Sequence, residues 1–166
     1  MSKFDSTPLT PERLREVLDY DPMTGVFSWK FARRGVRAGS TPGSILQNGY
    51  SYIRVDRTSY LTHRLVWLWV NRCWPDNHID HIDGNRANNR IENLRDASRS
   101  INNQNQRRAH LRSTSTMLGV YKDKKKWNAK IGLGGEVYNL GNYSTKEEAH
   151  EAYLGAKRLI HPGCTI

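Results

Sequence analysis

The sequence contains little cysteine and no long hydrophobic run. Its 166 residues include only Cys73 and Cys164, far apart and without a C-x-x-C pair. This excludes a disulfide framework and a cysteine zinc site, and favours a reducing cytoplasm. The longest apolar run, residues 65–70, is far too short to span a bilayer, and the polar residues 1–8 do not resemble a signal peptide. We therefore expect an unsecreted protein with no membrane partner.

Acidic residues are also scarce. Aspartate and glutamate number 16 against 26 lysines and arginines, which gives a formal net charge of +10. A solvated cationic surface is the simplest explanation, and basic membrane-surface proteins need an amphipathic basic helix that is not evident here. The positive charge is spread along the chain and interleaved with Trp, Tyr and Asn, which favours contact with nucleic acid phosphates.

The pattern of residues predicts a mixed α+β protein built from two modules and a linker. The first module covers residues 1–108, the polar linker residues 109–118, and the second module residues 119–166. The length allows either one ordinary domain or two modules that each bury a modest core, and the pattern favours two. The sequence shows no obvious dimerisation stripe, so we expect a monomer.

The first module is expected to begin with a helix that Thr10 caps and Pro11 opens, and that ends at residues 21–25. Strands are predicted at residues 26–29 and 50–56, with Tyr60 and Leu61 pairing back. Thr62 is expected to cap a second, mostly buried helix that has ended by Pro75. Between the strands lies a glycine-rich loop, expected to contact phosphates through Arg33, Arg34 and Arg37.

Residues 79–108 are unusually rich in Asn, Asp and Arg. Asp83-Gly84 predicts a hairpin turn between two short strands. Ser98 is placed to cap a helix that runs through Ile101, Asn102 and Gln106. The segment is therefore predicted to form a strand, a strand and a helix.

This stretch resembles the HNH, or ββα-metal, nuclease motif, with a core at residues 78–106. Its three named positions are His81, Asn93 and Asn102, and their separations resemble those of phage homing endonucleases that end the motif in asparagine. Three further stretches match the family: His63-Arg64-Leu65-Val66, Asp80-His81-Ile82-Asp83-Gly84-Asn85 and Glu92-Asn93-Leu94-Arg95. Singly, each residue is more often structural than catalytic; the ordered set is what points to the family.

The resemblance implies a role for each position. His81 is the general base that takes a proton from water, and Asn93 orients the loop that carries it. Asp80 and Asn102 hold one divalent cation at the scissile phosphate. Because these ligands are oxygens, we expect Mg²⁺ or Mn²⁺, with zinc as the second choice.

Other polar residues near the motif have competing interpretations. His78 lies three residues before His81 on a strand, hence on the opposite face, and is interpreted as loop or surface. His63 could touch phosphate at a helix start or simply pack. Four arginines flank the motif and could pair with acidic residues or contact phosphates: Arg64, Arg86, Arg90 and Arg95. Phosphate contact is favoured for Arg86 and Arg90.

The second module is predicted to contain strands at residues 119–121, 127–132 and 137–141, with a turn at Gly134-Gly135. A helix follows, opened by a capping box of Thr145 and Glu148. One face of that helix is expected to cover the sheet: Ala149, Ala152, Tyr153, Ala156 and Leu159. On the middle strand, parity places Trp127, Ala129 and Ile131 against the helix and leaves Asn128 and Lys130 pointing outward.

This module resembles the ethylene-response-factor (APETALA) DNA-binding domain. The resemblance lies in residues 119–121, 126–131, 140–143, 147–149 and 152–153. It implies a three-stranded antiparallel sheet in the major groove with one covering helix behind it. Base-contact positions differ from those of the plant domains, so their target sequence should not carry over. The expected DNA contacts are Tyr121, Lys122, Lys124, Lys125, Lys126, Lys130 and Asn139, although a solvated lysine loop is the alternative.

Together the two resemblances predict a metal-dependent, HNH homing-type endonuclease that acts on double-stranded DNA, a phage protein in the cytoplasm of its bacterial host. One site in each chain is expected to nick one strand. Two alternatives remain open: a non-catalytic, sequence-specific DNA-binding regulator that keeps the motif as scaffold, and a structure-directed phage nuclease.

Overall fold

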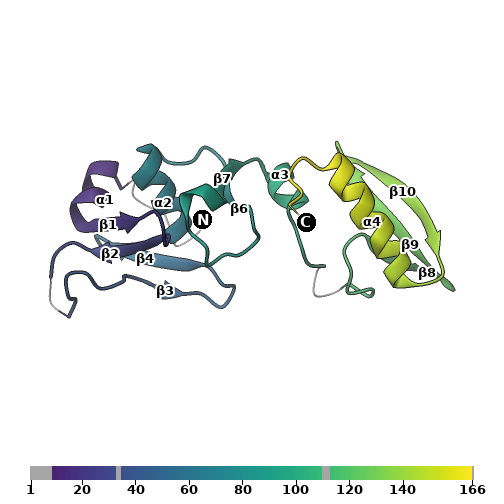
Figure 1. Ribbon diagram of the computed structural model, residues 1–166, viewed down its shortest axis with the longest axis horizontal. Coiled ribbons are helices and arrows are strands. Elements are labelled where there is room, and N and C mark those ends of the chain that lie inside the picture. Colours follow the sequence, from purple (N-terminus) through teal and green to yellow (C-terminus); the bar gives the residue numbers. More distant parts are fainter. Residues whose placement is uncertain (1–8, 33–34, 110–112, 166) are drawn as a thin grey trace. The chain divides into compact units, whose positions relative to one another are not determined.

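The chain forms two compact units, residues 1–97 and 98–166 (Figure 1). A computed structural model describes residues 9–32, 35–109 and 113–165. Both units combine helices with antiparallel strands, so the predicted mixed α+β class is confirmed. The boundary between the units follows the second strand of the predicted strand–strand–helix motif. The division of the chain into modules at residues 108 and 119 stays a prediction.

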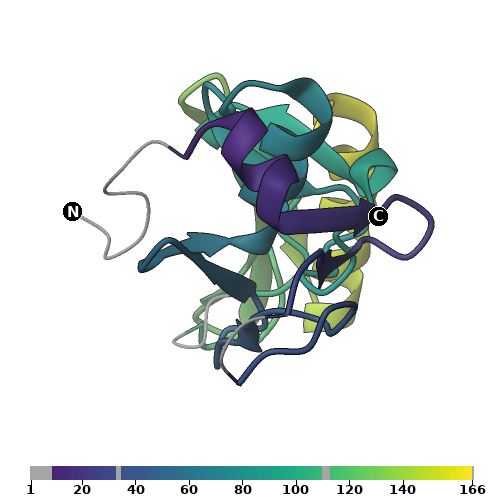
Figure 2. The ribbon, with the colours of Figure 1, turned by 90° about the vertical axis from the view of Figure 1, so that its left-hand side faces the viewer.

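The first unit contains helices α1 (Pro11–Val17) and α2 (Thr62–Asn71) and a 3-10 turn, η1 (Ile91–Asn93). Its strands are β1 (Leu18–Asp21), β2 (Val26–Trp29), β3 (Ser44–Ile45), β4 (Ser51–Val55), β5 (Thr58–Leu61), β6 (His78–His81) and β7 (Leu94–Ala97). They pair as β1–β2, β3–β4–β5 and β6–β7. Helices α1 and α2 lie on one side of the β3–β4–β5 sheet (Figure 2).

The first helix is shorter than the sequence predicted. Thr10 caps it as expected, since its side chain accepts a hydrogen bond from the backbone N–H of Arg13 at 3.2 Å. The helix ends at Val17, because Leu18 is extended (φ −123°, ψ 150°) and pairs with Trp29 in an antiparallel ladder. Leu18 and Tyr20 are buried while their neighbours are exposed, which is the alternation of a strand.

The expected cap of the second helix is wrong by one residue. Leu61 is the N-cap of α2 and no side chain caps it, whereas Thr62 is a buried residue inside the first turn. Leu61 still belongs to β5, so the chain passes from strand to helix without a loop. The predicted burial of the helix is confirmed by Leu65, Val66 and Leu68, which have no exposed surface.

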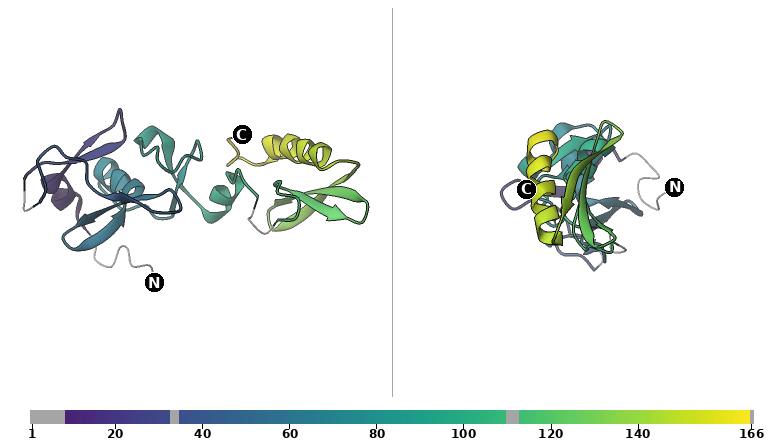
Figure 3. Two further views of the ribbon diagram at one scale, coloured as in Figure 1. Left: turned by 90° about the horizontal axis from the view of Figure 1, so that it is seen from below. Right: turned by 90° about the vertical axis from the view of Figure 1, so that its right-hand side faces the viewer.

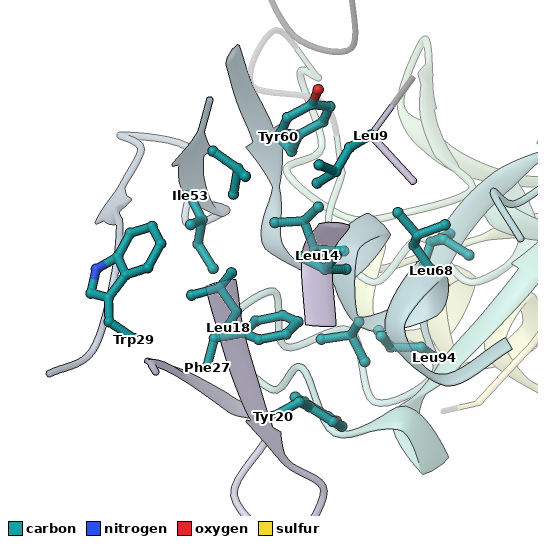
Figure 4. Close-up of a cluster of buried hydrophobic side chains, with 14 residues drawn as sticks. Leu9, Leu14, Leu18, Tyr20, Phe27, Trp29, Ile53, Tyr60, Leu68 and Leu94 are labelled. Carbon is teal, nitrogen blue, oxygen red and sulfur yellow. The ribbon is translucent and has the colours of Figure 1, made fainter. Parts of the chain in front are cut away.

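Apolar side chains from α1, β1, β2, β4, β5, α2, β6 and β7 form one core in the first unit (Figure 4). Leu14, Leu65 and Leu68 are fully buried in it. Leu94 of β7 belongs to the same core, which attaches the β6–β7 pair to the helices. Burying a leucine side chain stabilises a fold by roughly 1.5–3 kcal/mol. The segment expected to carry the chemistry therefore rests on the core of the whole first unit.

The second unit contains α3 (Arg99–Gln104), β8 (Val120–Asp123), β9 (Lys126–Leu133), β10 (Glu136–Tyr143) and α4 (Lys146–Ile160). The strands form an antiparallel sheet in the order β10–β9–β8, and α4 covers one face of it (Figure 3). The capping box of Thr145 and Glu148 is present as predicted. Leu159 was expected on the covered face but is 86% exposed. It lies two residues beyond buried Lys157, which turns it by roughly 200° around the helix axis.

Helix α3 packs within the second unit against the end of the chain. Ser98 caps it as expected, accepting from the backbone N–H of Ile101, but the helix ends at Gln104, before the predicted Gln106. The Gln104 side chain accepts a hydrogen bond from the backbone N–H of Gly163 at 3.1 Å. The ammonium group of buried Lys157 donates to the carbonyl of Gln106 at 2.5 Å. Helix α4 and the residues that follow it thus hold the end of the helix that carries Asn102.

In the described part of the chain, every helix is too short or too polar to cross a bilayer.

Two glycines of the second unit provide a matched test of its packing. Gly119 (φ +70°) and Gly134 (φ +63°) share a left-handed backbone that disfavours other residues, but their surroundings differ. A Cβ on Gly119 would lie 1.9 Å from the Tyr153 ring, whereas one on Gly134 would meet nothing within 4 Å.

We expect Gly134→Ala to lower the free energy of unfolding by about 1–2 kcal/mol through backbone strain alone. Gly119→Ala should cost a further ~1–3 kcal/mol, because the ring must move. Urea unfolding of both variants measures the difference. Equal losses would contradict the packing of Tyr153 against Gly119.

Candidate active site

Strand β6 ends at His81, and its pairing with β7 fixes the surroundings of the motif. Asp80 lies opposite Arg95 and His81 opposite Leu94. Residues 82–93 join the two strands, so the predicted tight hairpin at Asp83-Gly84 is wrong. A turn does form there, closed by a 2.8 Å hydrogen bond from the backbone N–H of Gly84 to the carbonyl of His81. The chain then continues through a polar loop before it returns as β7.

Asn93 is buried and ties the two ends of this loop together. Its Nδ2 group donates to Asp83 Oδ1 at 2.9 Å and to the carbonyl of Asn88 at 2.8 Å. Its Oδ1 atom accepts from the backbone N–H of Asp83 at 2.9 Å. The backbone N–H of Ile82 also donates to the carbonyl of Asn93, at 2.8 Å. These bonds hold the loop that follows His81, and the loop-orienting role of Asn93 in the reaction stays a prediction.

The imidazole of His81 is 3% exposed and lies among aromatic rings. Its ring centroid is 5.2 Å from that of His63, edge to face, and 5.9 Å from that of Tyr50. Tyr50 also lies 5.2 Å from His63, so the three rings form one cluster. The Nε2 atom of His81 is 3.2 Å from the side-chain oxygen of buried Asn89. His78, at the other end of β6, is exposed as expected.

Burial keeps both imidazoles of the cluster neutral. It lowers the pKa of His63 to about 3, with nearby His81 and Arg64 acting in the same direction. Burial also lowers the pKa of His81, although its hydrogen bond with Asn89 opposes this shift. A neutral imidazole keeps a lone pair that can accept a proton. Because His63 is both buried and neutral, the structure favours packing over phosphate contact for this residue.

Asp80 is held by an arginine across the strand pair. Its Oδ2 atom accepts from Nε and Nη2 of Arg95 at 3.0 and 2.7 Å, and its side chain is 8% exposed. Of the two interpretations of Arg95, pairing with an acidic residue is the one observed. Such a buried pair fixes the carboxylate, and loss of one partner would leave the other charge uncompensated.

The two predicted metal ligands lie in different units of the fold. Asp80, in β6, belongs to the first unit and carries a carboxylate, whereas Asn102, in α3, belongs to the second unit and carries an amide. Across residues 9–32, 35–109 and 113–165, no three His, Cys, Asp or Glu residues gather where they could hold a metal ion. Carboxylate and amide oxygens are each ligands of small, hard cations such as Mg²⁺.

The predicted phosphate contacts of the first unit lie in different settings. Arg33 and Arg34 are outside the described residues, while Arg37 and Arg90 are exposed. Arg86 is exposed but held: its guanidinium lies 4.7 Å from the Tyr50 ring centroid and donates to the Asn48 carbonyl at 2.7 Å. This brings a cation next to the aromatic cluster. Arg64 is half-buried over the ring of Trp74, at 5.4 Å.

The middle strand of the second unit shows the predicted parity. Ala129 and Ile131 are buried and Trp127 packs against the core, whereas Lys130 is exposed. Asn128 points to the other face as expected but is only 5% exposed. Its Nδ2 group donates to the side-chain oxygens of Asn139 and Asn142, both at 2.9 Å. Neighbouring asparagines thus cover it.

The opposite face of this sheet carries most of the predicted DNA contacts. Tyr121 is 56% exposed, and the ammonium group of Lys130 lies 5.9 Å from its ring centroid. The Asn139 oxygen accepts from Asn128 and from the backbone N–H of Gly141, beside a β-bulge. Exposed lysines lie at the adjoining ends of β8 and β9 and in the turn between these strands: Lys122, Lys124, Lys125 and Lys126. None of the four forms an ion pair within the described ranges.

Sequence patterns missed several residues that surround His81. Asn89 and Tyr50 contact its ring, and the Tyr20 hydroxyl donates to the backbone carbonyl of Asn89 at 3.0 Å. They come from three separate segments and follow no shared period. The Asn-rich composition of residues 79–108 was the one available signal, and it did not distinguish Asn89 from its neighbours.

The lowered pKa of His63 predicts a loss of stability in acid. Below about pH 6.5 an unfolded chain protonates this imidazole, while the folded chain does not until about pH 3. Unfolding then takes up a proton, so the free energy of unfolding falls by up to about 1.4 kcal/mol for each unit of pH across that window. Above about pH 6.5 the imidazole is neutral in both states, so the full stability that neutral His63 contributes is present there.

His63→Phe removes the titration and keeps a ring of similar size. Urea unfolding between about pH 7 and about pH 4.5 should show a shallower pH dependence for this variant than for the parent. An equally steep loss in both proteins would contradict the assignment of this acid sensitivity to His63.

Comparison with known proteins identifies the same segment. Residues 60–104 match the model of the HNH endonuclease family. A stretch of 72 residues is 33% identical to the SPbeta prophage-derived putative HNH homing endonuclease YosQ of Bacillus subtilis (strain 168), covering 43% of this chain and 42% of that protein. No solved structure matches. The residues that the family model matches, called the family segment from here on, include β6, its loop, β7 and α3.

Proposed function

We propose that this chain is a metal-dependent DNA endonuclease of the HNH homing type. One observation carries the proposal: within the family segment, buried and neutral His81 stands at the end of β6, beside a loop that Asn93 ties closed. A general base needs a lone pair and a fixed position, and this arrangement supplies both. The prophage-derived relative, described as a homing endonuclease, supports the same class and a phage origin.

His81 is the general base of the proposed reaction. It takes a proton from a water molecule as the water oxygen bonds to phosphorus, and the bond from phosphorus to the leaving oxygen breaks. Asn93 acts on His81 by holding the loop that follows it. Arg86, stacked on Tyr50 next to the His81 cluster, is placed to contact the backbone phosphate.

Asp80 and Asn102 are the proposed ligands of one divalent cation, Mg²⁺ or Mn²⁺. When bound, such an ion supplies positive charge that stabilises the phosphate and the leaving oxygen. Arg95 fixes the Asp80 carboxylate in advance of binding. A carboxylate and an amide oxygen match the hard cation better than zinc, which prefers nitrogen and sulfur ligands.

The second unit is proposed to help select the cleavage site on double-stranded DNA. Its exposed sheet face offers Tyr121, Lys130 and Asn139 to the DNA, and the lysines of the β8–β9 turn add positive charge. Positive side chains at phosphates contribute affinity that does not depend on sequence, whereas side chains at base edges distinguish sequences. One HNH site in a monomer is expected to nick a single strand.

Conversion of supercoiled plasmid to the nicked form in Mg²⁺ tests the catalytic role of His81. We expect His81→Ala to slow nicking by roughly 10²- to 10⁴-fold, the usual contribution of a positioned general base. His78→Ala is the matched control, because His78 lies on the same strand but is exposed, and it should nick at the parent rate. A chelator should abolish product in every sample.

The alternatives give different results when plasmid nicking is run beside gel retardation and beside cleavage of branched DNA. A DNA-binding regulator would retard the plasmid on a gel without any metal-dependent product. A structure-directed nuclease would cut branched DNA and ignore sequence. If His81→Ala nicks as fast as the parent, the assignment of the base is wrong.

Asn102 and its neighbour Asn103 provide a matched test of the metal site. Asn102→Ala should raise the Mg²⁺ concentration needed for half-maximal nicking by roughly tenfold or more, because one oxygen ligand is lost. Asn103→Ala changes an exposed asparagine on the same helix and should leave the metal dependence unchanged. A similar shift in both variants would show that α3 was disturbed, and no shift in Asn102→Ala would exclude Asn102 as a ligand.

A further inference from the structure

We propose that Asn89 is a positioning residue that holds His81 in the tautomer with its proton on Nε2, so that Nδ1 accepts the proton from water. The inference rests on the proposed role of His81 as the base. It concerns a residue outside the three named positions of the motif, and it assigns a separate task to each nitrogen of the ring.

A buried hydrogen bond joins the side chains of His81 and Asn89. Nε2 of His81 lies 3.2 Å from Oδ1 of Asn89, and the two residues are 3% and 5% exposed. Buried polar groups are nearly always paired, so this contact determines where the single proton of a neutral imidazole resides. If the amide oxygen faces the ring, Nε2 must be the donor.

The other side of the Asn89 amide fixes its orientation. The Nδ2 atom lies 3.4 Å from the carbonyl oxygen of Ala87 and 3.4 Å from the hydroxyl oxygen of Ser51. A carbonyl oxygen can only accept a hydrogen bond, so the NH₂ group must face Ala87. The amide oxygen then faces His81, the proton is on Nε2, and the lone pair is on Nδ1.

The backbone of Asn89 is held from the opposite direction by the β1–β2 hairpin. The Tyr20 hydroxyl donates to the Asn89 carbonyl and accepts from the backbone N–H of Ile91, both at 3.0 Å. Burial raises the pKa of Tyr20, so the phenol keeps its proton and remains a donor. Gly25, in the hairpin turn, approaches so closely that a Cβ there would lie 2.7 Å from the Asn89 carbonyl carbon.

Neighbouring rings restrict rotation of the imidazole. His63 packs edge to face against His81, and Tyr50 lies at a tilt of 50° to it. Exchanging the two nitrogens would require the ring to turn within this cluster. The fixed amide and the packed rings together define one tautomer and one orientation.

Nitrogen NMR of the full-length protein tests the proposal directly. Histidine labelled with ¹⁵N gives distinct ring correlations for the two neutral tautomers, and the six histidines are distinguished by the loss of one signal set in His81→Gln. We expect the parent to show a protonated Nε2 at His81. Asn89→Leu, which removes the acceptor at similar size, should give a mixture of tautomers.

Two variants separate positioning from general support of the loop. Asn89→Asp keeps an acceptor toward the ring and should retain the Nε2 proton. Asn88→Leu removes a side chain that donates to Asp83 at 2.8 Å but does not touch His81, so it should also retain the parent tautomer. In plasmid nicking, Asn89→Leu should lower kcat by roughly 10- to 100-fold with an unchanged KM for DNA.

The outcomes distinguish failure of this inference from failure of the proposed function. A parent protein with its proton on Nδ1, or an Asn89→Leu variant with the parent tautomer, overturns the role of Asn89. The same holds if Asn88→Leu changes the tautomer as much as Asn89→Leu does. If the NMR spectra show the expected tautomers but His81→Ala nicks at the parent rate, Asn89 still determines the tautomer of His81. In that case His81 is not the base.

Discussion

Buried amides in the loop between β6 and β7 impose the main constraint on this fold, because each unpaired polar group in the interior costs about 1–3 kcal/mol. Asn93 satisfies its amide with both ends of the loop, and Asn89 satisfies its own with His81 and Ala87. The loop offers little apolar surface, so hydrogen bonds rather than packing determine its path. The position of the His81 imidazole follows from that network.

Residues before the family segment also help to hold the loop and the His81 imidazole in place. The β1–β2 hairpin brings Tyr20 and Gly25 against the backbone of residues 89–91, and the chain before β4 brings Tyr50 against the imidazole pair. Each of these three residues lies more than thirty residues before His81 in the sequence. A strand pair and loop of this size have too small a core to stand alone, and here the core of the first unit supports β6 and β7.

The two faces of the sheet in the second unit carry different kinds of side chain. Small apolar side chains meet α4 on one face, while asparagines, lysines and a tyrosine occupy the other. Asn128 shows how a polar face can be rigid: it is buried beneath Asn139 and Asn142 and joins β9 to the bulged part of β10. A sheet surface fixed in this way can present its exposed side chains to a partner without ordering them first.

The sequence by itself determined the features that depend on near neighbours. Thr10, Ser98 and Thr145 cap helices because their partners lie three residues ahead, and alternation on β9 predicted which side chains meet α4. Only the tertiary structure decided that Leu18–Asp21 is a strand, since its partner β2 supplies the hydrogen bonds. Likewise Asp80 meets Arg95, and His81 meets Asn89, through strand register and loop closure. Contacts set by such long-range pairing leave no local period in a sequence, so the fold alone specifies them.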